Sequence, residues 1–206
     1  MKYREVIIEQ LKAQPYFTKQ AFFQLANGYS IKDSTLNTYI TRSIIRKDII
    51  QLRRGLYVTT DFYTKNKADT TYLFYLANVL RGPSYVSSWT ALQYYNLTTE
   101  IISTVTSVTE KVTRDYETKV GTFSYYSIHK KHFTDFSLVK GKFEFFIASP
   151  SKALFDLLYF KTNQLRGVTF EMIDPLVESL RIDIEEMDDD EREKFYSLVK
   201  KQLKHE

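Results

Sequence analysis

The chain has 206 residues, of which 43% are hydrophobic, and its formal net charge is +4. That length fits one large domain or two small ones, and the hydrophobic fraction excludes a chain that is disordered throughout. The absence of cysteine excludes a disulfide framework, a thiolate metal site and a cysteine nucleophile. No apolar run is long enough to span a bilayer, and charges stand where a signal peptide needs apolar residues, so we expect a soluble cytoplasmic protein.

Charge is unevenly distributed along the chain. Residues 1–67 contain 12 lysines and arginines against 5 aspartates and glutamates, whereas residues 168–206 contain 6 against 12. A basic first third is what contact with phosphate groups requires, although a basic surface can also serve only to keep a protein hydrated. The distribution therefore favours nucleic acid as a partner of the N-terminal part.

Two helices are expected before residue 30. Apolar residues recur at helical spacing over residues 3–13, and Pro15 ends that helix. Thr18 is placed to cap a second helix, and Gly28 is of the residue type that commonly closes one.

A third helix and a β-hairpin are expected next. Asp33 or Ser34 is placed to cap the helix, which runs to about Lys47. Two strand-like runs, 49–52 and 56–60, are joined by an Arg-Arg-Gly turn, which predicts a tight hairpin. Three helices followed by a hairpin have the order of a winged helix-turn-helix, so we expect such a DNA-binding domain over residues 1–60.

The rest of the chain predicts a linker and a second domain. Residues 61–69 are polar and are interpreted as the linker, and residues 70–206 predict a mixed α+β domain, so the expected fold class is α+β. The expected elements of this domain are a helix over 70–80, a strand at 85–86, a helix that Ser87 caps and that runs through Tyr95, strands over 104–109, 121–128 and 143–148, a helix from Pro150 to Phe160, and helices near 170–181 and 189–204.

The third helix has two contrasting faces when its residues are placed about 100° apart. The arc expected to face the core contains Leu36, Tyr39, Ile40, Ser43 and Ile44. The opposite arc contains Ser34, Thr35, Asn37, Thr38, Thr41, Arg42 and Ile45. Short hydrogen-bonding side chains with an arginine are suited to reading base edges in a major groove, whereas a surface helix without a ligand usually carries pairs of opposite charge.

No acidic residue lies between Asp33 and Asp48, so nothing on the outer arc repels phosphate. An ordinary polar face is the alternative interpretation of this arc. We expect Thr35, Thr38 and Arg42 to contact bases. The residues expected to assist them or to hold phosphates are Ser34, Asn37 and Thr41.

Two arginines mark the tip of the expected hairpin. Arg53 and Arg54 are adjacent cations that nothing in the local sequence neutralises, which suits contact with phosphates or a minor groove. Arg46 and Lys47 end the third helix, where complementing the helix dipole is a sufficient explanation.

Catalytic patterns are weak in this sequence. Ser149 and Lys152 have the spacing of a serine–lysine pair, but a helix N-cap followed by proline explains both. Glu117 and Lys119 are similar to the acid–lysine pair of metal-dependent nucleases, which would need a second carboxylate to hold the metal. Asp115 and Glu110 are the available candidates, and neither has a clear position at the end of a strand. No glycine-rich phosphate loop is present. We therefore expect no enzyme, no catalytic residue, no metal and no other cofactor.

The acidic run 183–191 has a structural explanation as well as a functional one. Acidic residues favour a helix N-terminus, and the helix expected next ends in lysines, so the run fits the helix dipole. Mimicry of nucleic acid or docking on a basic partner is the alternative.

Several segments resemble the AbiEi antitoxins, the antitoxin half of abortive-infection type IV toxin–antitoxin systems. The resemblance covers about residues 5–160 and departs from the family pattern at Ser151, where glutamate is usual, and at Asn96, where glycine is usual. The segments that carry it are 53–58 (RRGLYV), 84–97 (SYVSSWTALQYYNL), 104–111 (TVTSVTEK), 121–125 (GTFSY) and 147–159 (IASPSKALFDLLY).

The resemblance implies a transcriptional repressor of its own operon that binds inverted repeats in double-stranded DNA. It also implies an antitoxin that neutralises a nucleotidyltransferase toxin without forming a stable complex with it, and no membrane partner. A winged-helix regulator whose α+β domain senses a ligand or a partner is the first alternative. A metal-dependent nuclease centred on Glu117 and Lys119 is the second.

Overall fold

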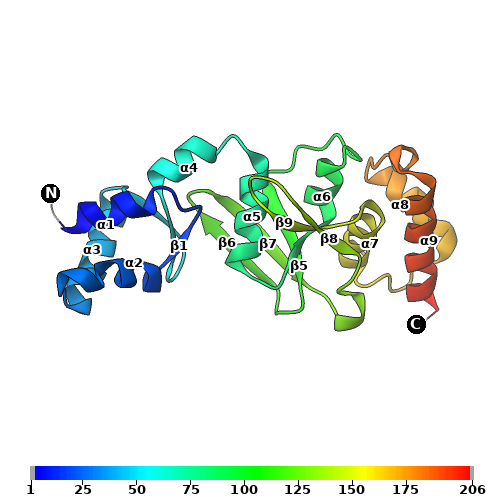
Figure 1. Ribbon diagram of the computed structural model, residues 1–206. Coiled ribbons are helices and arrows are strands. Elements are labelled where there is room, and N and C mark those ends of the chain that lie inside the picture. The colour runs from blue at the N-terminus through cyan, green and yellow to red at the C-terminus, as the bar shows by residue number, and fades with distance from the viewer. Residues whose placement is uncertain (1–2, 205–206) are drawn as a thin grey trace. The chain divides into compact units, whose positions relative to one another are not determined.

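The computed structural model describes residues 3–204 and is of the mixed α+β class, with helices and two β-sheets (Figure 1). The chain divides into two compact units. The N-terminal unit extends to Leu73 and also takes in Tyr116–Gly121. The C-terminal unit contains Phe74–Asp115 and the chain from Thr122 onwards.

Helices and a small sheet make up the N-terminal unit. Three strands form an antiparallel sheet in the order β1-β3-β2. The elements are α1 (Tyr3–Leu11), β1 (Phe17–Thr18), α2 (Lys19–Ala26), α3 (Asp33–Ile45), β2 (Ile49–Arg53), β3 (Leu56–Thr59) and α4 (Thr60–Asn66).

Side chains from the three helices and the sheet share one apolar core in this unit. Ile7, Phe22 and Leu36 are each at most 2% exposed and come from α1, α2 and α3. The ring of Phe17 stacks on Tyr57 at 5.6 Å between centroids, which ties β1 and β3 to the same core. The apolar periodicity that predicts the helices therefore also predicts which faces are buried.

Local capping differs from expectation at two of three positions. Thr18 caps α2 as predicted, because its Oγ1 accepts a hydrogen bond from the Ala21 amide at 3.1 Å. Gly28 does not close α2: it lies within a short 3-10 turn, and Ser30 takes the left-handed conformation after it, with φ of 53°. The third helix begins at Asp33 but has no side-chain cap, since Lys32 occupies the capping position.

The segment interpreted as a linker contains a helix. Thr59 caps α4 through a bond from the amide of Phe62, and Asn66 is buried, with its Nδ2 donating to the Phe62 carbonyl at 2.8 Å. Polar residues in this segment therefore bond to the backbone of their own helix.

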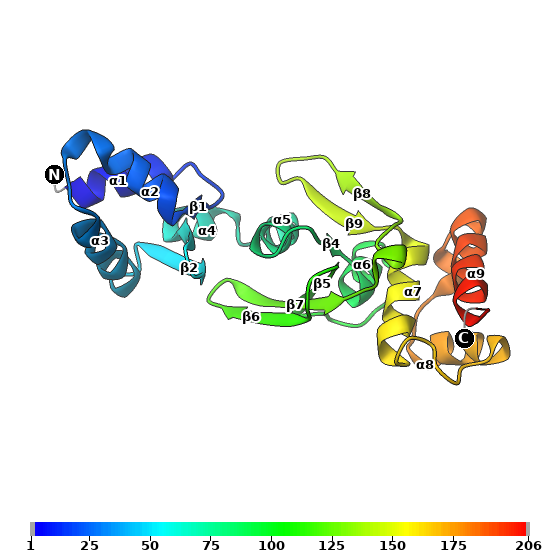
Figure 2. The same ribbon diagram turned by 90° about the horizontal axis from the view of Figure 1, so that it is seen from below.

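The C-terminal unit is built on the larger sheet, whose strands have the order β6-β7-β5-β4-β9-β8, and the residues of β6 from Tyr116 onwards are counted in the N-terminal unit. Figure 2 shows α5 on one side of the sheet and α6 and α7 on the other. The elements are α5 (Thr70–Leu80, which begins just before this unit), β4 (Tyr85–Val86), α6 (Ser88–Tyr94), β5 (Thr104–Thr109), β6 (Arg114–Thr118), β7 (Gly121–Ser127), β8 (Phe136–Val139), β9 (Phe145–Ala148), α7 (Pro150–Lys161), α8 (Ile173–Ser179) and α9 (Asp189–Leu203).

Alternation along the strands explains the two covered faces. On β7, Tyr125 points towards α5, where its hydroxyl donates to the Ala77 carbonyl at 2.6 Å. On the neighbouring β5, Thr106 points to the opposite face, where it bonds to Thr90 of α6. The edge strands β6 and β8 were not expected from the sequence: β6 is mostly polar, and β8 is only four residues long, with no buried residue in either strand.

A charged pair lies inside this core. Lys152 and Asp156 on α7 are 1% and 0% exposed, and the Lys152 ammonium donates directly to the Asp156 carboxylate. The other carboxylate oxygen accepts from Tyr85 at 3.0 Å and from Ser87 at 2.7 Å. Burial, with the charge of Asp156, raises the pKa of Tyr85 far above its ordinary value, so this hydroxyl remains a donor.

This network changes the interpretation of two sequence motifs. Ser87 precedes α6 as predicted but does not cap it with its side chain, since its hydroxyl bonds to Asp156 instead. Ser149 caps α7 by accepting from the Lys152 amide, and the Lys152 side chain lies in the core. The serine–lysine spacing thus reflects a helix cap and a buried ion pair.

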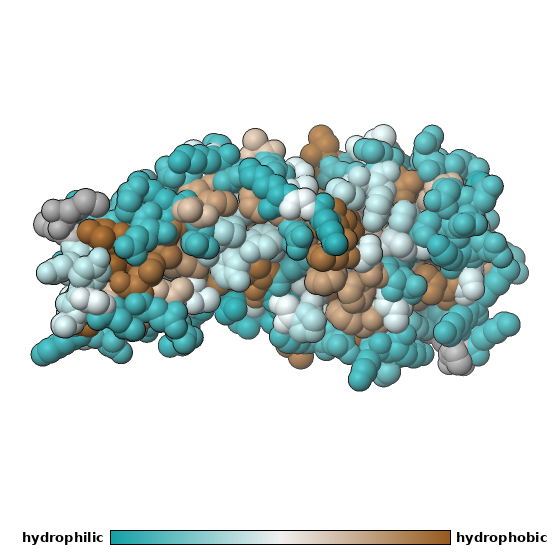
Figure 3. Space-filling model, in the orientation of Figure 1, coloured by the Kyte–Doolittle hydropathy of each residue, from teal (hydrophilic) through white to brown (hydrophobic). Residues whose placement is uncertain are grey.

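The acidic run opens the last helix. Asp188 caps α9 by accepting from the Glu191 amide at 2.8 Å, as the dipole argument predicts. Burial opposes ionisation of Glu191, but hydrogen bonds from Ser151 and Lys194 outweigh it and hold the pKa of Glu191 below its ordinary value. On the face drawn in Figure 3, hydrophilic residues cover most of the surface over α8 and α9.

None of the helices in residues 3–204 combines the length and the apolar composition that crossing a membrane would require.

Candidate nucleic-acid interface

The outer arc of α3 is exposed, as the helical wheel predicts. Leu36 and Ile40, on the opposite arc, are 2% and 5% exposed and pack in the core. Ser43, on the same arc, is fully buried, and its hydroxyl is satisfied by a hydrogen bond to the Tyr39 carbonyl at 2.7 Å. Thr35 is half-buried. The exposed residues of the outer arc are Ser34, Asn37, Thr38, Thr41, Arg42 and Ile45.

Two threonines on this arc bond to their own helix. Thr38 donates through Oγ1 to the Ser34 carbonyl at 3.0 Å, and Thr41 donates to the Asn37 carbonyl at 3.1 Å. In this rotamer each hydroxyl offers lone pairs and a methyl group outward rather than a proton. Such groups can accept from an exocyclic amine or contact a thymine methyl in a major groove.

Arg42 and Ile45 complete the outer arc with a cation and an apolar group. Arg42 is exposed and forms no ion pair within residues 3–204, so its guanidinium is available for bidentate contact with guanine. Ile45 is 73% exposed, which places a large apolar side chain in water beside it. A thymine methyl is the group on DNA that this side chain suits.

The hairpin tip carries two further unpaired cations. Arg53 ends β2, and Arg54 occupies the turn with Gly55, whose φ of +79° is the left-handed conformation that glycine adopts without strain. Both arginines are exposed, and neither is within ion-pair distance of a carboxylate in the described part of the chain. The turn therefore presents two guanidinium groups to solvent.

The acidic residue that follows α3 already forms an ion pair within the unit. Asp48 lies 3.8 Å from the guanidinium of Arg4, which is buried. Arg46 and Lys47, which the sequence assigned only to the helix dipole, are exposed and have no carboxylate partner within residues 3–204. Arg46 and Lys47 therefore continue the series of unpaired cations along the chain from α3 to the hairpin. The absence of acids between Asp33 and Asp48 is the sequence signal that could have identified them.

The residues of the nuclease interpretation lie elsewhere. Asp115 and Glu117 are two apart on β6, so they share a face of an edge strand, and both are exposed. Lys119 lies in the turn after β6. Residues 3–204 contain no cluster of three histidine, aspartate or glutamate side chains arranged to hold a metal ion.

Comparison with known proteins gives no independent assignment, since no protein-family model and no curated protein matches the chain. A role for this surface is therefore argued from the geometry and charge of α3 and the hairpin.

Proposed function

We propose that the N-terminal unit is a winged helix-turn-helix domain that binds double-stranded DNA. The observation that carries the proposal is the exposed, acid-free outer arc of α3 followed by a hairpin with two unpaired arginines at its tip. In this arrangement α3 enters the major groove, and the β2–β3 hairpin is the wing.

Each group has a role set by its chemistry. Arg42, Thr35 and Thr38 contact base edges, because a guanidinium and short hydroxyl side chains match their donors and acceptors. Ser34, Asn37 and Thr41 assist them or hold phosphates. Arg53 and Arg54 add phosphate or minor-groove affinity without reading sequence in the major groove.

The resemblance to AbiEi antitoxins supports a wider role. The protein then represses its own operon by binding inverted repeats, and it counteracts a nucleotidyltransferase toxin without a stable complex. An inverted repeat calls for two copies of the domain related by a two-fold axis. DNA binding belongs to residues 1–60 in this proposal, and antitoxicity needs residues 70–206.

A regulator whose C-terminal unit senses a ligand is the second candidate. It is favoured by a cavity of about 230 Å³ on the α6–α7 face of the sheet, which contains an exposed lysine and three aromatic side chains. Co-expression with the product of the adjacent gene separates the two candidates. If the adjacent gene product stops growth and co-expression of this chain restores it, the antitoxin proposal is supported. If the adjacent gene product does not affect growth, the ligand-sensing regulator is supported.

Selection from a pool of random duplexes tests the DNA-binding proposal directly. The full chain should enrich an inverted repeat, and Arg42→Ala should relax the preference at one position of each half-site. Enrichment of no sequence, or an unchanged preference in Arg42→Ala, would contradict the assignment of α3.

Growth rescue and a promoter reporter test the division of labour. Arg42→Ala/Arg53→Ala/Arg54→Ala should lose repression while still protecting cells from the toxin, because exposed substitutions of this kind seldom unfold a domain. Loss of both activities in a variant that remains folded and equally abundant would show that the two roles are not separable.

A further inference from the structure

A small cavity in the C-terminal unit lies between the sheet and the helices α6 and α7. Its volume is about 230 Å³. Thr106 on β5 and Tyr126 on β7 contribute from the sheet, and α7 contributes Lys161 at its end. The full set of lining residues is Ser88, Trp89, Thr106, Tyr126, Leu157, Phe160 and Lys161.

Aromatic rings form much of the cavity wall. Tyr126 and Phe160 stack with their ring centroids 5.0 Å apart and an interplanar angle of 26°. The ammonium of Lys161 lies 5.9 Å from the centroid of the Trp89 ring. Flat rings of this kind bind other flat rings by stacking, and a cation at their edge attracts negative charge.

Several polar side chains of the cavity have no hydrogen-bond partner among the described residues, whereas Thr106 bonds to Ser87 and Thr90. The side chains of Ser88, Trp89 and Tyr126 form no hydrogen bond within residues 3–204, and Lys161 forms no ion pair there. Ser88 is 4% exposed as a residue, and its hydroxyl oxygen stays accessible within the cavity. None of the lining residues is acidic. The Ser88 hydroxyl is therefore free to donate a hydrogen bond to an anion that enters the cavity.

The backbone at Ser88 is held in an unfavourable conformation. Its φ is 55°, the left-handed region that a residue with a side chain seldom occupies. Ser87, immediately before it, is fixed on three sides: its amide donates to the Thr106 carbonyl, its carbonyl accepts from Thr106 Oγ1, and its hydroxyl donates to Asp156. Strain of this kind persists where the surroundings overdetermine the backbone, and it concentrates at ligand sites.

We propose that this cavity binds a small anion that carries a flat unsaturated ring, either a nucleoside monophosphate or an aromatic carboxylate. The ring lies against the aromatic wall, and the anionic group is held by Lys161 and the free donors. The buried Lys152–Asp156 pair acts through Ser87 as the support that presents Ser88 to this ligand. The inference does not rest on DNA binding, because every lining residue belongs to the C-terminal unit.

Volume and charge limit the ligand. The cavity is smaller than the roughly 300–1,000 Å³ of sites that enclose a drug-sized molecule, so it accommodates the flat ring system, while the anionic group and any sugar that joins the two lie at the open side. Lys161 is exposed, which places the cation where a phosphate or carboxylate would reach solvent. A neutral ring would leave the cation unmatched, and inorganic phosphate would leave the aromatic wall unused.

Tryptophan fluorescence gives a direct readout, because Trp89 is the single tryptophan of the chain and lines the cavity. The full chain is titrated with the four ribonucleoside monophosphates, with benzoate and indole carboxylates, with the neutral nucleosides and with inorganic phosphate. We expect a saturable change of emission with at least one ring-bearing anion, at least tenfold weaker binding of its neutral analogue, and no saturation with phosphate. Comparison of the nucleotide titrations with the carboxylate titrations shows which of the two classes of anion the cavity binds.

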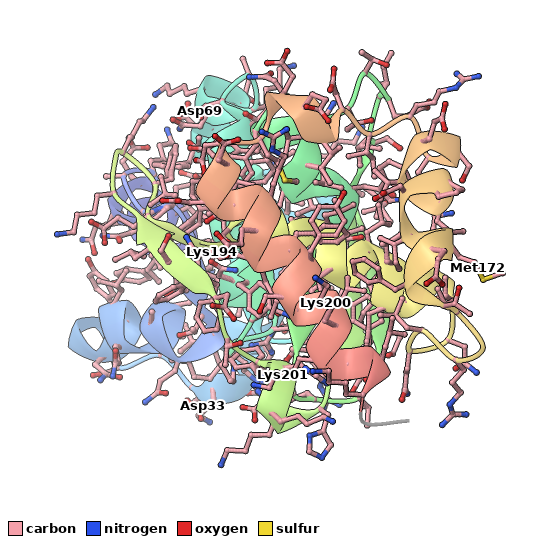
Figure 4. The ribbon with its side chains drawn as sticks, turned by 90° about the vertical axis from the view of Figure 1, so that its right-hand side faces the viewer. Asp33, Asp69, Met172, Lys194, Lys200 and Lys201 are labelled. Carbon is pink, nitrogen blue, oxygen red and sulfur yellow. The ribbon has the colours of Figure 1, made fainter. Side chains whose placement is uncertain are left out.

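Three variants assign the binding to this cavity. Ser88→Gly removes the hydroxyl but relieves the left-handed strain, so it should fold at least as well as the parent and bind at least tenfold more weakly. Lys161→Gln should weaken binding by a similar factor. Lys200→Gln is the matched control, since Lys200 on α9 (Figure 4) also lies over an aromatic ring, at 4.9 Å from Phe170, and outside this cavity. It should bind as the parent does.

The proposal is overturned by saturation with none of the ring-bearing anions, or by phosphate alone binding as tightly as they do. Unchanged affinity in either cavity variant would also overturn it, as would an equal loss in Lys200→Gln, which would indicate only a general attraction to lysines.

Discussion

The helices α3 and α7 carry similar polar residues in opposite surroundings. On α3, the side chains of Arg42, Thr38 and Thr41 are exposed and have no partner beyond their own helix. On α7, Lys152 and Asp156 are covered by α6, α9 and β9 and bond to each other. The Lys152–Asp156 pair of α7 is satisfied inside the fold, whereas the polar side chains of the outer arc of α3 remain available to a ligand.

The difference between α3 and α7 predicts that the largest loss of stability follows from a substitution on α7. Asp156→Ala leaves the Lys152 ammonium buried without its counter-charge and removes the acceptor of Tyr85 and Ser87. Breaking one side of a buried pair costs about 3–5 kcal/mol, so urea unfolding of the full chain should show a loss of that size.

A double variant provides the control for this loss. Lys152→Met/Asp156→Leu removes both charges and should recover part of the stability, because no unpaired charge stays in the core. A loss in Asp156→Ala no larger than that of an exposed substitution would show that the pair is not buried as described.

The corresponding change on α3 should affect DNA binding and leave stability unchanged. Arg42→Ala should weaken binding to the selected duplex by about 1–3 kcal/mol, because one bidentate contact to a base is lost. Lys12→Ala, just after α1 and paired with Glu9, is the control and should bind as the parent. Fluorescence anisotropy with labelled duplex measures both, and equal affinity of Arg42→Ala and parent would remove α3 from the interface.

The stability of the C-terminal unit should also depend on pH, through His132. Burial, followed by the charges of Lys131 and Lys152, lowers the pKa of His132 from 6.5 to about 4. Between these values the unfolded chain binds a proton that the folded chain does not, so stability falls as the pH decreases from 6.5 towards 4. Because the ring is partly exposed, we expect about 1–2 kcal/mol from this group.

Denaturation at a series of pH values measures this effect. His132→Phe keeps an aromatic side chain beside Phe155 and Tyr159 but cannot titrate, so its stability should fall less steeply over the same range. Parallel curves for parent and variant would show that His132 does not contribute to the pH dependence.

The smallest effect expected is a gain in stability. Ser88→Gly replaces a residue held at a φ of 55° by one that adopts this conformation freely. The left-handed conformation costs a non-glycine residue about 1–2 kcal/mol, and glycine loses part of this through its greater freedom when unfolded, so a net gain of about 1 kcal/mol is expected. A lower melting temperature in this variant would show that the hydroxyl is structurally required.

Sequence was most informative where local pattern decides the structure. The outer arc of α3 follows from helical spacing alone, and the β2–β3 hairpin follows from the turn at Gly55. The prediction that Gly28 closes α2 was wrong, because the chain continues into a 3-10 turn and Ser30 takes the left-handed conformation that ends it. Residue type alone does not distinguish these two endings.

Long-range contacts could not be predicted in the same way. The hydroxyl of Ser87 was expected to cap α6, but its partner Asp156 is 69 positions away, and Tyr85 is 71 positions from the same carboxylate. Sequence spacing likewise could not bring Ser88 to Lys161, since β5, β7 and two helices must pack together before the cavity exists. The exposed surface was therefore easier to anticipate than the cavity.

The most direct test of DNA binding through α3 and the hairpin is its salt dependence in the full chain. Arg53→Ala/Arg54→Ala should reduce the slope of log K against log salt by about two units, because each arginine neutralises one phosphate. Lys130→Ala/Lys131→Ala removes two adjacent exposed cations from the C-terminal unit and should leave the slope unchanged. An unchanged slope in the arginine variant, with the protein folded, would place the hairpin away from DNA.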